Sequence, residues 1–191
     1  MTAQNNDSDQ NMIQTVAIIG AGTAGRSFAL ACVRAGLHIV LEDVMPANLR
    51  CAQDDYANLS SEGTGSLMTA LTVEDAVRSA DLAVDFVPDE LESKLEIFSM
   101  IDRMAPPRTI LLTPSDAQSI TDLASCTYRP RLCFAVRDGL AVAAPVHLVH
   151  PPEFDPTALA AVRDFLAALG CTVRVEQDPI VPMLMKNQLH G

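Results

Sequence analysis

The residues with the clearest chemical potential are the glycines near the amino end of the chain, in the segment Gly20-Ala21-Gly22-Thr23-Ala24-Gly25. A G-x-G-x-x-G pattern becomes informative where it joins a strand to a helix. Here the apolar, β-branched run Thr15–Ile19 precedes it, and apolar residues at helical spacing follow it. Gly20 allows a tight turn, Gly22 lets the backbone approach a pyrophosphate, and Gly25 lets helix and strand pack closely. Free amides at the helix start would bind the phosphates.

A carboxylate follows this loop at the distance that ribose recognition requires. Asp43 lies 23 residues after Gly20, beyond a second apolar segment, His38–Leu41. An acid at this place can accept hydrogen bonds from the ribose hydroxyls of NAD, and it repels the additional phosphate of NADP. The neighbouring Glu42 adds to that repulsion. The pattern therefore predicts NAD as the cofactor, and the alternative is a tight turn followed by a solvated acid.

Strand and helix signals alternate along the rest of the chain. Short apolar segments predict strands, and longer segments with helical spacing predict the helices between them. The alternation predicts an α/β fold of the Rossmann type, a doubly wound, mainly parallel sheet with helices on both faces. Beyond the first strand–helix–strand unit, strands are expected within 81–87, 108–113, 131–136, 144–149 and 172–176, and helices over 90–104, from 119 to 124, and over 156–170.

The remaining segments complete the predicted organisation. Met45 to Leu71 is less regular, with a loop at Ser60–Ser66, and Thr72 with Asp75 resembles a capping box before a short helix. Residues 1–14 are expected to be a disordered polar tail and residues 15–178 the NAD-binding domain. Residues 179–191 form an apolar tail that should pack on a partner subunit.

Composition limits the classes of partner. Of the 191 residues, 49% are hydrophobic and 4% aromatic, and the formal net charge is −11. A chain this acidic repels nucleic acid and anionic membranes, and no stretch approaches the roughly 20 apolar residues of a membrane span. The five cysteines, odd in number and without a C-x-x-C pair, predict neither disulfides nor zinc. We therefore expect a cytoplasmic protein with reduced thiols, no metal, and no nucleic-acid or membrane partner.

Several longer segments resemble the NAD-binding domain of the L-3-hydroxyacyl-CoA dehydrogenases. They are VAIIGAGTAGRSFALACVRAGLHIVLEDV, ADLAVDFVPDELESKLEIFSMID, ILLTPSDAQSITDLA and the stretch from Pro145 to Asp178. In that family an acid and a lysine five residues later contact NAD, and the matching residues here are Asp89 and Lys94. The resemblance also implies that Val87, Pro88 and Ser115 line the cofactor site. A solvated helix lysine is the alternative for Lys94.

The sequence departs from the family where the family's catalytic residues stand. The family's N-T-S-S, whose serine holds the substrate oxygen, is matched by Pro114-Ser115-Asp116-Ala117, and no histidine lies in Phe134–Leu140 where the family has its general base. The family's K-L-V-E, whose glutamate orients that base, is matched by His147-Leu148-Val149-His150. The family's acid–base pair is therefore absent as such. Its helical second domain, which forms the dimer, is also expected to be missing, because the chain ends at Gly191.

Three residues are candidates for a substituted catalytic group. Arg137 and Asp138 stand where the family's histidine would lie, so Arg137 can hold a carboxylate or carbonyl oxygen and Asp138 can act as a base. An ion pair in a surface turn is the alternative. His150, or His147, is a candidate base, and a half-exposed strand histidine is the alternative there.

These observations leave three functional hypotheses. The first is an NAD(H)-dependent oxidoreductase that moves hydride to or from a small hydroxy or keto compound, whose identity the sequence leaves open. The second is a non-catalytic NAD(H)-binding module that senses redox state or completes a site with a partner. The third is a vestigial domain that no longer binds nucleotide. The apolar tail Ile180–Leu189 predicts a homodimer, because it should not remain in water.

Overall fold

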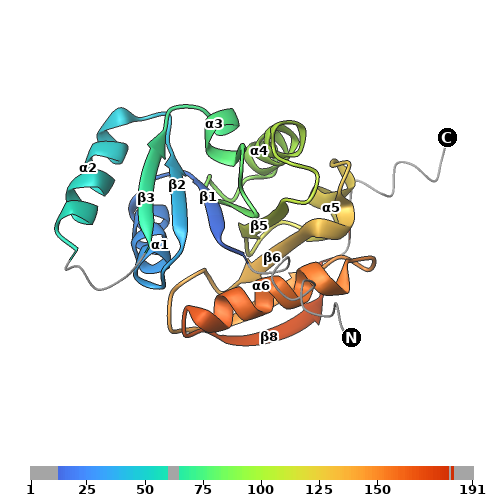
Figure 1. Ribbon diagram of the computed structural model, residues 1–191. Coiled ribbons are helices and arrows are strands. Elements are labelled where there is room, and N and C mark those ends of the chain that lie inside the picture. Colours follow the sequence, from blue (N-terminus) through green and yellow to red (C-terminus); the bar gives the residue numbers. More distant parts are fainter. Residues whose placement is uncertain (1–12, 60–64, 181, 183–191) are drawn as a thin grey trace, which may run out of the picture.

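One sheet organises the structure, a computed structural model that describes residues 13–59, 65–180 and 182. The sheet has eight strands in the order β3-β2-β1-β4-β5-β6-β7-β8 (Figure 1). The strands are β1 (Thr15–Ile19), β2 (His38–Glu42), β3 (Ser66–Ala70), β4 (Leu82–Asp85), β5 (Ile110–Pro114), β6 (Cys133–Arg137), β7 (Pro145–His150) and β8 (Thr172–Gln177). All neighbours are parallel except β6 and β7. The predicted α/β fold with a mainly parallel sheet is confirmed.

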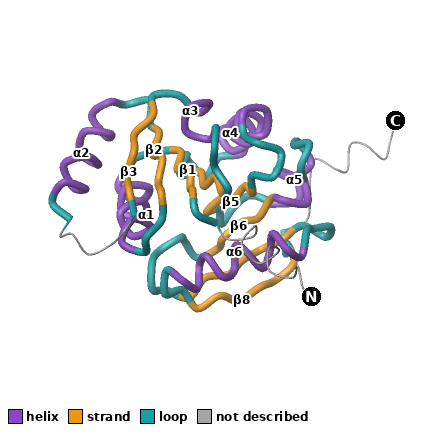
Figure 2. Tube along the Cα trace, in the orientation of Figure 1, coloured by secondary structure: helices purple, strands orange, loops and turns teal. Residues whose placement is uncertain are grey.

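Helices cover both faces of the sheet, as predicted, and α4 and α6 lie on opposite sides of the strands (Figure 2). They are α1 (Thr23–Arg34), α2 (Pro46–Ala57), α3 (Val73–Val77), α4 (Leu91–Met104), α5 (Ile120–Ser125) and α6 (Pro156–Ala168), with a short 3₁₀ helix at Pro130–Leu132. Strand residues such as Ile18 and Phe134 pack with α1, α2 and α6 on what we call the α1–α6 face. Residues such as Ala17 and Ala135 pack with α3, α4 and α5 on the α4–α5 face.

The expectation of irregular structure between Met45 and Leu71 is wrong. This stretch holds α2 and β3, and its predicted loop at Ser60–Ser66 lies mostly outside the described residues. Only Leu49 and Ala52 of α2 are buried, and four of the five residues of the edge strand β3 remain partly or fully exposed. Both elements therefore lack the apolar periodicity on which sequence-based prediction depends.

Local signals set several boundaries correctly. The Thr72 hydroxyl caps α3 by accepting a 3.2 Å hydrogen bond from the Asp75 amide, and Gly36, after α1, has a φ of 91° that favours glycine. The polar tail expected at 1–14 lies mostly outside the described residues, as does most of the apolar tail from Ile180 to Leu189.

Candidate functional site

The glycine loop joins the carboxyl end of β1 to the first turn of α1. Gly20 has a φ of 101°, and its amide donates a 2.8 Å hydrogen bond to the carbonyl oxygen of Glu42, which anchors the turn to β2. Gly22 is the N-cap of α1, where no side chain caps the helix and no acidic residue lies in the first turn. The amides at the start of α1, at Thr23 and Ala24, therefore keep their capacity to bind an anion.

Two positions of the loop favour glycine for different reasons. A Cβ on Gly22 would meet no atom within 4 Å, so its backbone faces open space that a ligand can approach. A Cβ on Gly25 would lie 2.0 Å from the carbonyl oxygen of Gly20, a distance that no real Cβ tolerates. Gly25 is thus required for α1 to pack against the loop, as the sequence predicts.

Asp43 directly follows β2, and its carboxylate is bound to the glycine loop. Its Oδ2 accepts hydrogen bonds from the Ala21 amide at 2.7 Å and from the Asn48 side chain at 3.0 Å, and its Oδ1 accepts one from the Met45 amide at 2.7 Å. Because a carboxylate oxygen can accept two hydrogen bonds, Oδ1 keeps capacity for a ribose hydroxyl. Burial, followed by the charge of Asp43, raises the pKa of the neighbouring Glu42.

The segments after β4 and β5 are tied together by Asp89. Its carboxylate accepts hydrogen bonds from the Ser115 hydroxyl at 2.5 Å and from the amides of Asp116 and Ala117 at 2.9 and 3.1 Å. Burial raises the pKa of Asp89, but these hydrogen bonds and the charge of Lys94 outweigh it, so the pKa lies below its usual value. Three of the predicted cofactor residues, at positions 88, 89 and 115, are thereby brought to one edge of the sheet.

Lys94 lies in the interior instead of on a solvated helix face. Its side chain is completely buried, and its ammonium lies 2.6 Å from Asp85 Oδ1 and 3.1 Å from the Pro114 carbonyl oxygen. Burial raises the pKa of Asp85, and the charge of Lys94 opposes that shift. Hydrogen bonding by Lys94, the Thr113 side chain and the Val87 backbone also lowers the pKa of this carboxyl group. The pair links β4, α4 and β5 beneath the candidate cofactor site.

Apolar surface flanks the ends of the strands next to this site. Val44, after β2, is 83% exposed, and Leu71, after β3, is 69% exposed. The pairing of Glu42 with Ala70 puts Leu71 beside Asp43. A cavity of about 230 Å³ lies between the segment after β4 and α4. It is lined by Val87, Pro88, Ser93, Glu96, Ile97 and Met100. Sequence reasoning missed Leu71 because β3 itself was not predicted.

Arg137, a predicted catalytic candidate, is engaged in holding the loop after β5. Its guanidinium donates to the carbonyl oxygens of Ser115 and Gln118, the latter at 2.7 Å, and lies 3.5 Å from Asp178 Oδ1. Asp178 Oδ2 in turn accepts from the hydroxyls of Ser119 and Thr121. Arg137 Nε has no partner among the described residues. The sequence did not predict a role for Asp178, because Asp178 belongs to no motif and its contacts depend on the end of β8 lying near α5.

Asp138 lies one residue further on, at the exposed carboxyl edge of the sheet. It has a φ of 64°, its amide donates to Asp116 Oδ1 at 2.8 Å, and its side chain is 70% exposed. His147 lies beside it, with its Nδ1 3.8 Å from Asp138 Oδ2 and 3.6 Å from Glu176 Oε1. Asp138 and His147 are therefore neighbours across the β6–β7 pair.

The third catalytic candidate, His150, lies apart from these residues. Because alternate strand residues point to opposite faces, His150 follows Leu148 toward the α1–α6 face, whereas Arg137 follows Ala135 toward the α4–α5 face. The His150 ring packs against Phe154 with ring centres 4.1 Å apart, and its Nδ1 lies 2.8 Å from the Pro151 carbonyl oxygen. The structure does not bring the three candidates together.

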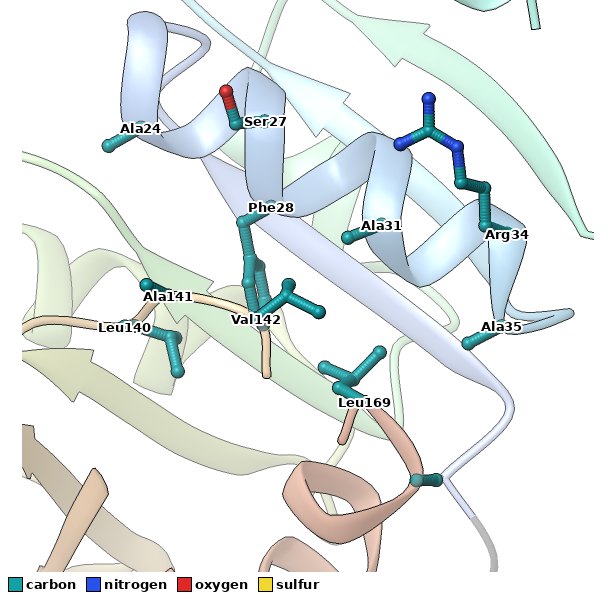
Figure 3. Close-up of a pocket in the computed structure, with 11 residues that line it drawn as sticks. Ala24, Ser27, Phe28, Ala31, Arg34, Ala35, Leu140, Ala141, Val142 and Leu169 are labelled. Carbon is teal, nitrogen blue, oxygen red and sulfur yellow. The ribbon is translucent and has the colours of Figure 1, made fainter. Parts of the chain in front are cut away.

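A second cavity, of about 640 Å³, lies between α1, residues 140–142 and the end of α6 (Figure 3). It is lined mainly by apolar residues of α1, of the segment after Gly139 and of the end of α6, with Phe28 near its centre. Ser27 and Arg34 are the polar residues that line it. It shares Ala24 with the glycine loop, and no acid or histidine is among its lining residues.

Other types of site are not found in the part of the chain that the structure describes. No cluster of three or more His, Cys, Asp or Glu side chains there is arranged to hold a metal ion. No helix in the same residues combines the length and apolar character needed to cross a bilayer. The cysteines are free, and burial raises the pKa of Cys133 to about 12, which keeps this thiol protonated.

Comparisons with known proteins agree with this geometry. Residues 15–178 match the family described as 3-hydroxyacyl-CoA dehydrogenase, NAD binding domain. The chain is 29% identical to 5-formyl-3-hydroxy-2-methylpyridine 4-carboxylate 5-dehydrogenase of Mesorhizobium japonicum, over 93% of its own length and 62% of that relative. It is 32% identical to 3-hydroxyadipyl-CoA dehydrogenase of Escherichia coli, over 59% and 26% of the two chains.

Solved structures give the same result. The structure of a 5-formyl-3-hydroxy-2-methylpyridine 4-carboxylic acid 5-dehydrogenase, described as an NAD⁺-dependent dismutase, superposes with a TM-score of 0.77 at 26% identity, over 93% of this chain and 62% of that one. The chain thus spans less than two thirds of the length of this relative.

Proposed function

The chain belongs to the 3-hydroxyacyl-CoA dehydrogenase family through its NAD-binding domain, and we propose that it binds NAD(H) at the carboxyl edge of β1, β2 and β4 and serves a hydride transfer involving a small hydroxy or keto compound. The observation that carries the proposal is the open backbone of Gly22 at the uncapped start of α1. In a protein of net charge −11, these amides supply the positive potential that a pyrophosphate needs.

Asp43 supports NAD over NADP. Three protein donors hold its carboxylate beside the glycine loop. The side chain cannot turn away from a ligand without losing those hydrogen bonds. A phosphate on the ribose would therefore meet a fixed negative charge, whereas a ribose hydroxyl would meet a free acceptor site on Oδ1.

The nicotinamide half would lie toward β4, β5 and β6, where Asp89 joins the segments after β4 and β5. Asp89 and Ser115 are fixed to each other, so they would shape this end of the site together. Lys94 would act from beneath by holding Asp85 and the end of β5. Bound NAD would supply the hydride acceptor, and the protein would provide orientation and a path for the proton.

Among the catalytic candidates, Asp138 is best situated to exchange a proton with a substrate hydroxyl. It is exposed at the carboxyl edge, with His147 beside it. As a carboxylate it would accept the proton when the hydroxyl is oxidised. Arg137 would position the loop after β5 rather than touch substrate. The names of the relatives extend the range of possible substrates to hydroxyacyl thioesters and to aldehydes of pyridine carboxylates.

A non-catalytic NAD(H)-binding module remains the second candidate function, and one observation favours it. The guanidinium of Arg137, next to the place of the family's base, is already committed to two carbonyl oxygens and to Asp178. Such a protein would bind the cofactor without turnover.

Titration with NADH, followed by nicotinamide fluorescence and repeated with NADPH, tests cofactor binding. We expect NADH to bind and NADPH to bind at least tenfold more weakly, as ionic repulsion at Asp43 requires. Absence of binding by either nucleotide would overturn both candidate functions.

A turnover assay then separates the two functions. The panel contains 3-hydroxyacyl thioesters, simple hydroxy acids and a pyridine aldehyde carboxylate, with Asp138→Asn as the matched variant. Turnover that Asp138→Asn abolishes while NADH affinity is retained supports the dehydrogenase, and binding without turnover supports the module.

A further inference from the structure

β8 lies at one end of the sheet, and within the described residues its outer edge has no strand partner. Among those residues β8 pairs with β7 alone, and each of its six residues is partly or fully exposed (Figure 1). An open edge presents a row of backbone donors and acceptors that another strand can use. From the pattern of its residues, we propose that β8 pairs antiparallel with β8 of a second copy of this chain, about a two-fold axis at Val175.

The backbone decides which residues can face the second copy. The amides of Thr172 and Asp178 donate to the carbonyl oxygens of Ala144 and His150, at 3.2 and 2.9 Å. Even-numbered residues of β8 therefore direct their amides toward β7. Along a strand, the backbone amide and carbonyl groups of successive residues point alternately to the two sides. Those of Val173, Val175 and Gln177 therefore point away from β7.

This alternation fits an axis at Val175. Two copies of Val175 would then exchange both of their backbone hydrogen bonds, and Val173 of each copy would do the same with Gln177 of the other. The next outward residue, Pro179, has no amide hydrogen, so the pairing would end there.

The side chains favour this register over the two neighbouring registers, whose axes lie at Arg174 and at Glu176. With the axis at Val175, Arg174 of each copy faces Glu176 of the other, which gives two equivalent pairs of opposite charge. An axis at Arg174 would put two arginines opposite each other, and an axis at Glu176 two glutamates. Like charges opposite each other destabilise a sheet. Arg174 forms no ion pair with residues in the described ranges, so it is available for this contact.

Val175 adds apolar contact at the centre. Its side chain is 39% exposed, a large value for a valine within a strand, and across the axis it would meet its own copy. The resulting interface is isologous, so it closes as a dimer and does not propagate into a filament. It continues the sheet through both copies and leaves the candidate nucleotide site, at β1 and β2, free.

Charge reversal in the full-length protein tests the register. Sedimentation equilibrium should detect a dimer of the wild type at micromolar concentration. Arg174→Glu would place carboxylates opposite Glu176 at both equivalent contacts, and we expect the dimer Kd to rise at least about tenfold. Glu176→Arg should do the same, whereas the double variant, which restores opposite charges, should recover most of the affinity.

Val175→Pro tests the backbone pairing separately from the charges. The amide of Val175 points away from β7, so proline at this edge position should leave the monomer folded. We expect no detectable dimer, with circular dichroism and NADH binding unchanged. Met68→Glu on the other edge strand, β3, is the control and should leave the dimer intact.

Three results would overturn the proposal. They are a wild type that remains monomeric, a dimer that survives both Arg174→Glu and Val175→Pro, and a double charge reversal that fails to recover affinity. The second result would assign dimerisation to another surface, such as the apolar tail.

Discussion

Adding a methyl group to Gly25 should destabilise the protein, because the space that the methyl needs is already filled by backbone. The new Cβ would lie 2.0 Å from the Gly20 carbonyl oxygen, whereas ordinary contacts of this kind begin near 3.4 Å. Either the loop or the first turn of α1 must move by more than about 1 Å in a packed region, which costs about 1–3 kcal/mol or more.

An opposing effect sets the net magnitude. Alanine is favoured over glycine within a helix by up to about 1 kcal/mol, so the net loss for Gly25→Ala should be about 1–2 kcal/mol. For a domain of this size, each kcal/mol lowers Tm by roughly 2–4 °C. Because the displaced loop carries the amides at the start of α1, NADH affinity should fall as well.

Gly22→Ala is the matched comparison. A Cβ there meets no atom of the protein, and its φ of −61° suits alanine. We therefore expect Tm to change little, with only the small loss due to alanine at an N-cap, while the Kd for NADH rises at least about tenfold because the methyl occupies the space of the pyrophosphate. Thermal unfolding by circular dichroism and NADH titration give the two readouts. An unchanged Tm for Gly25→Ala would refute the role of Gly25 in packing. Unchanged NADH affinity for Gly22→Ala would refute the role of Gly22 in pyrophosphate binding.

Three further predictions concern the charged groups. Lys94→Met should cost about 3–5 kcal/mol in urea unfolding, because it leaves Asp85 buried without its partner, and adding Asp85→Leu should recover most of that loss; a single variant of nearly wild-type stability would contradict this. Asp43→Asn should narrow the NADPH-to-NADH ratio of Kd values by about tenfold, and an unchanged ratio in the two titrations would mean that another group excludes NADPH. Since the pKa of Asp89 is lowered in the folded protein, its contribution to stability is present above its unfolded pKa and is lost as pH falls through its folded pKa. The difference in unfolding free energy between wild type and Asp89→Asn should therefore shrink as pH falls below about 4, and a difference that is constant down to pH about 2 would be inconsistent with the hydrogen bonds at this carboxylate.

The sequence by itself determined the parts of the protein that depend on local spacing. Residues close together in the sequence predict the glycine loop, the acid after β2 and the alternation of strands and helices. This is because tight turns, helix starts and buried strands each impose a local pattern. The resemblance to the family, carried by the same segments, agrees with the match over residues 15–178. The sequence did not predict α2 and β3, because an exposed helix and an edge strand bury too few residues to show apolar periodicity.

The tertiary structure decided which groups the charged residues contact. The sequence left Lys94 as either a cofactor contact or a solvated helix residue. In the structure its side chain is buried against Asp85. Arg137 looked like a catalytic candidate, and its guanidinium holds two carbonyl oxygens and Asp178. His150 points to the opposite face from Arg137 because Arg137 pairs with His147, three residues before His150, and strand residues alternate between faces. A side chain's chemistry is fixed by its residue type, but its partners come from strands distant in the sequence, and only the packed sheet brings them into contact.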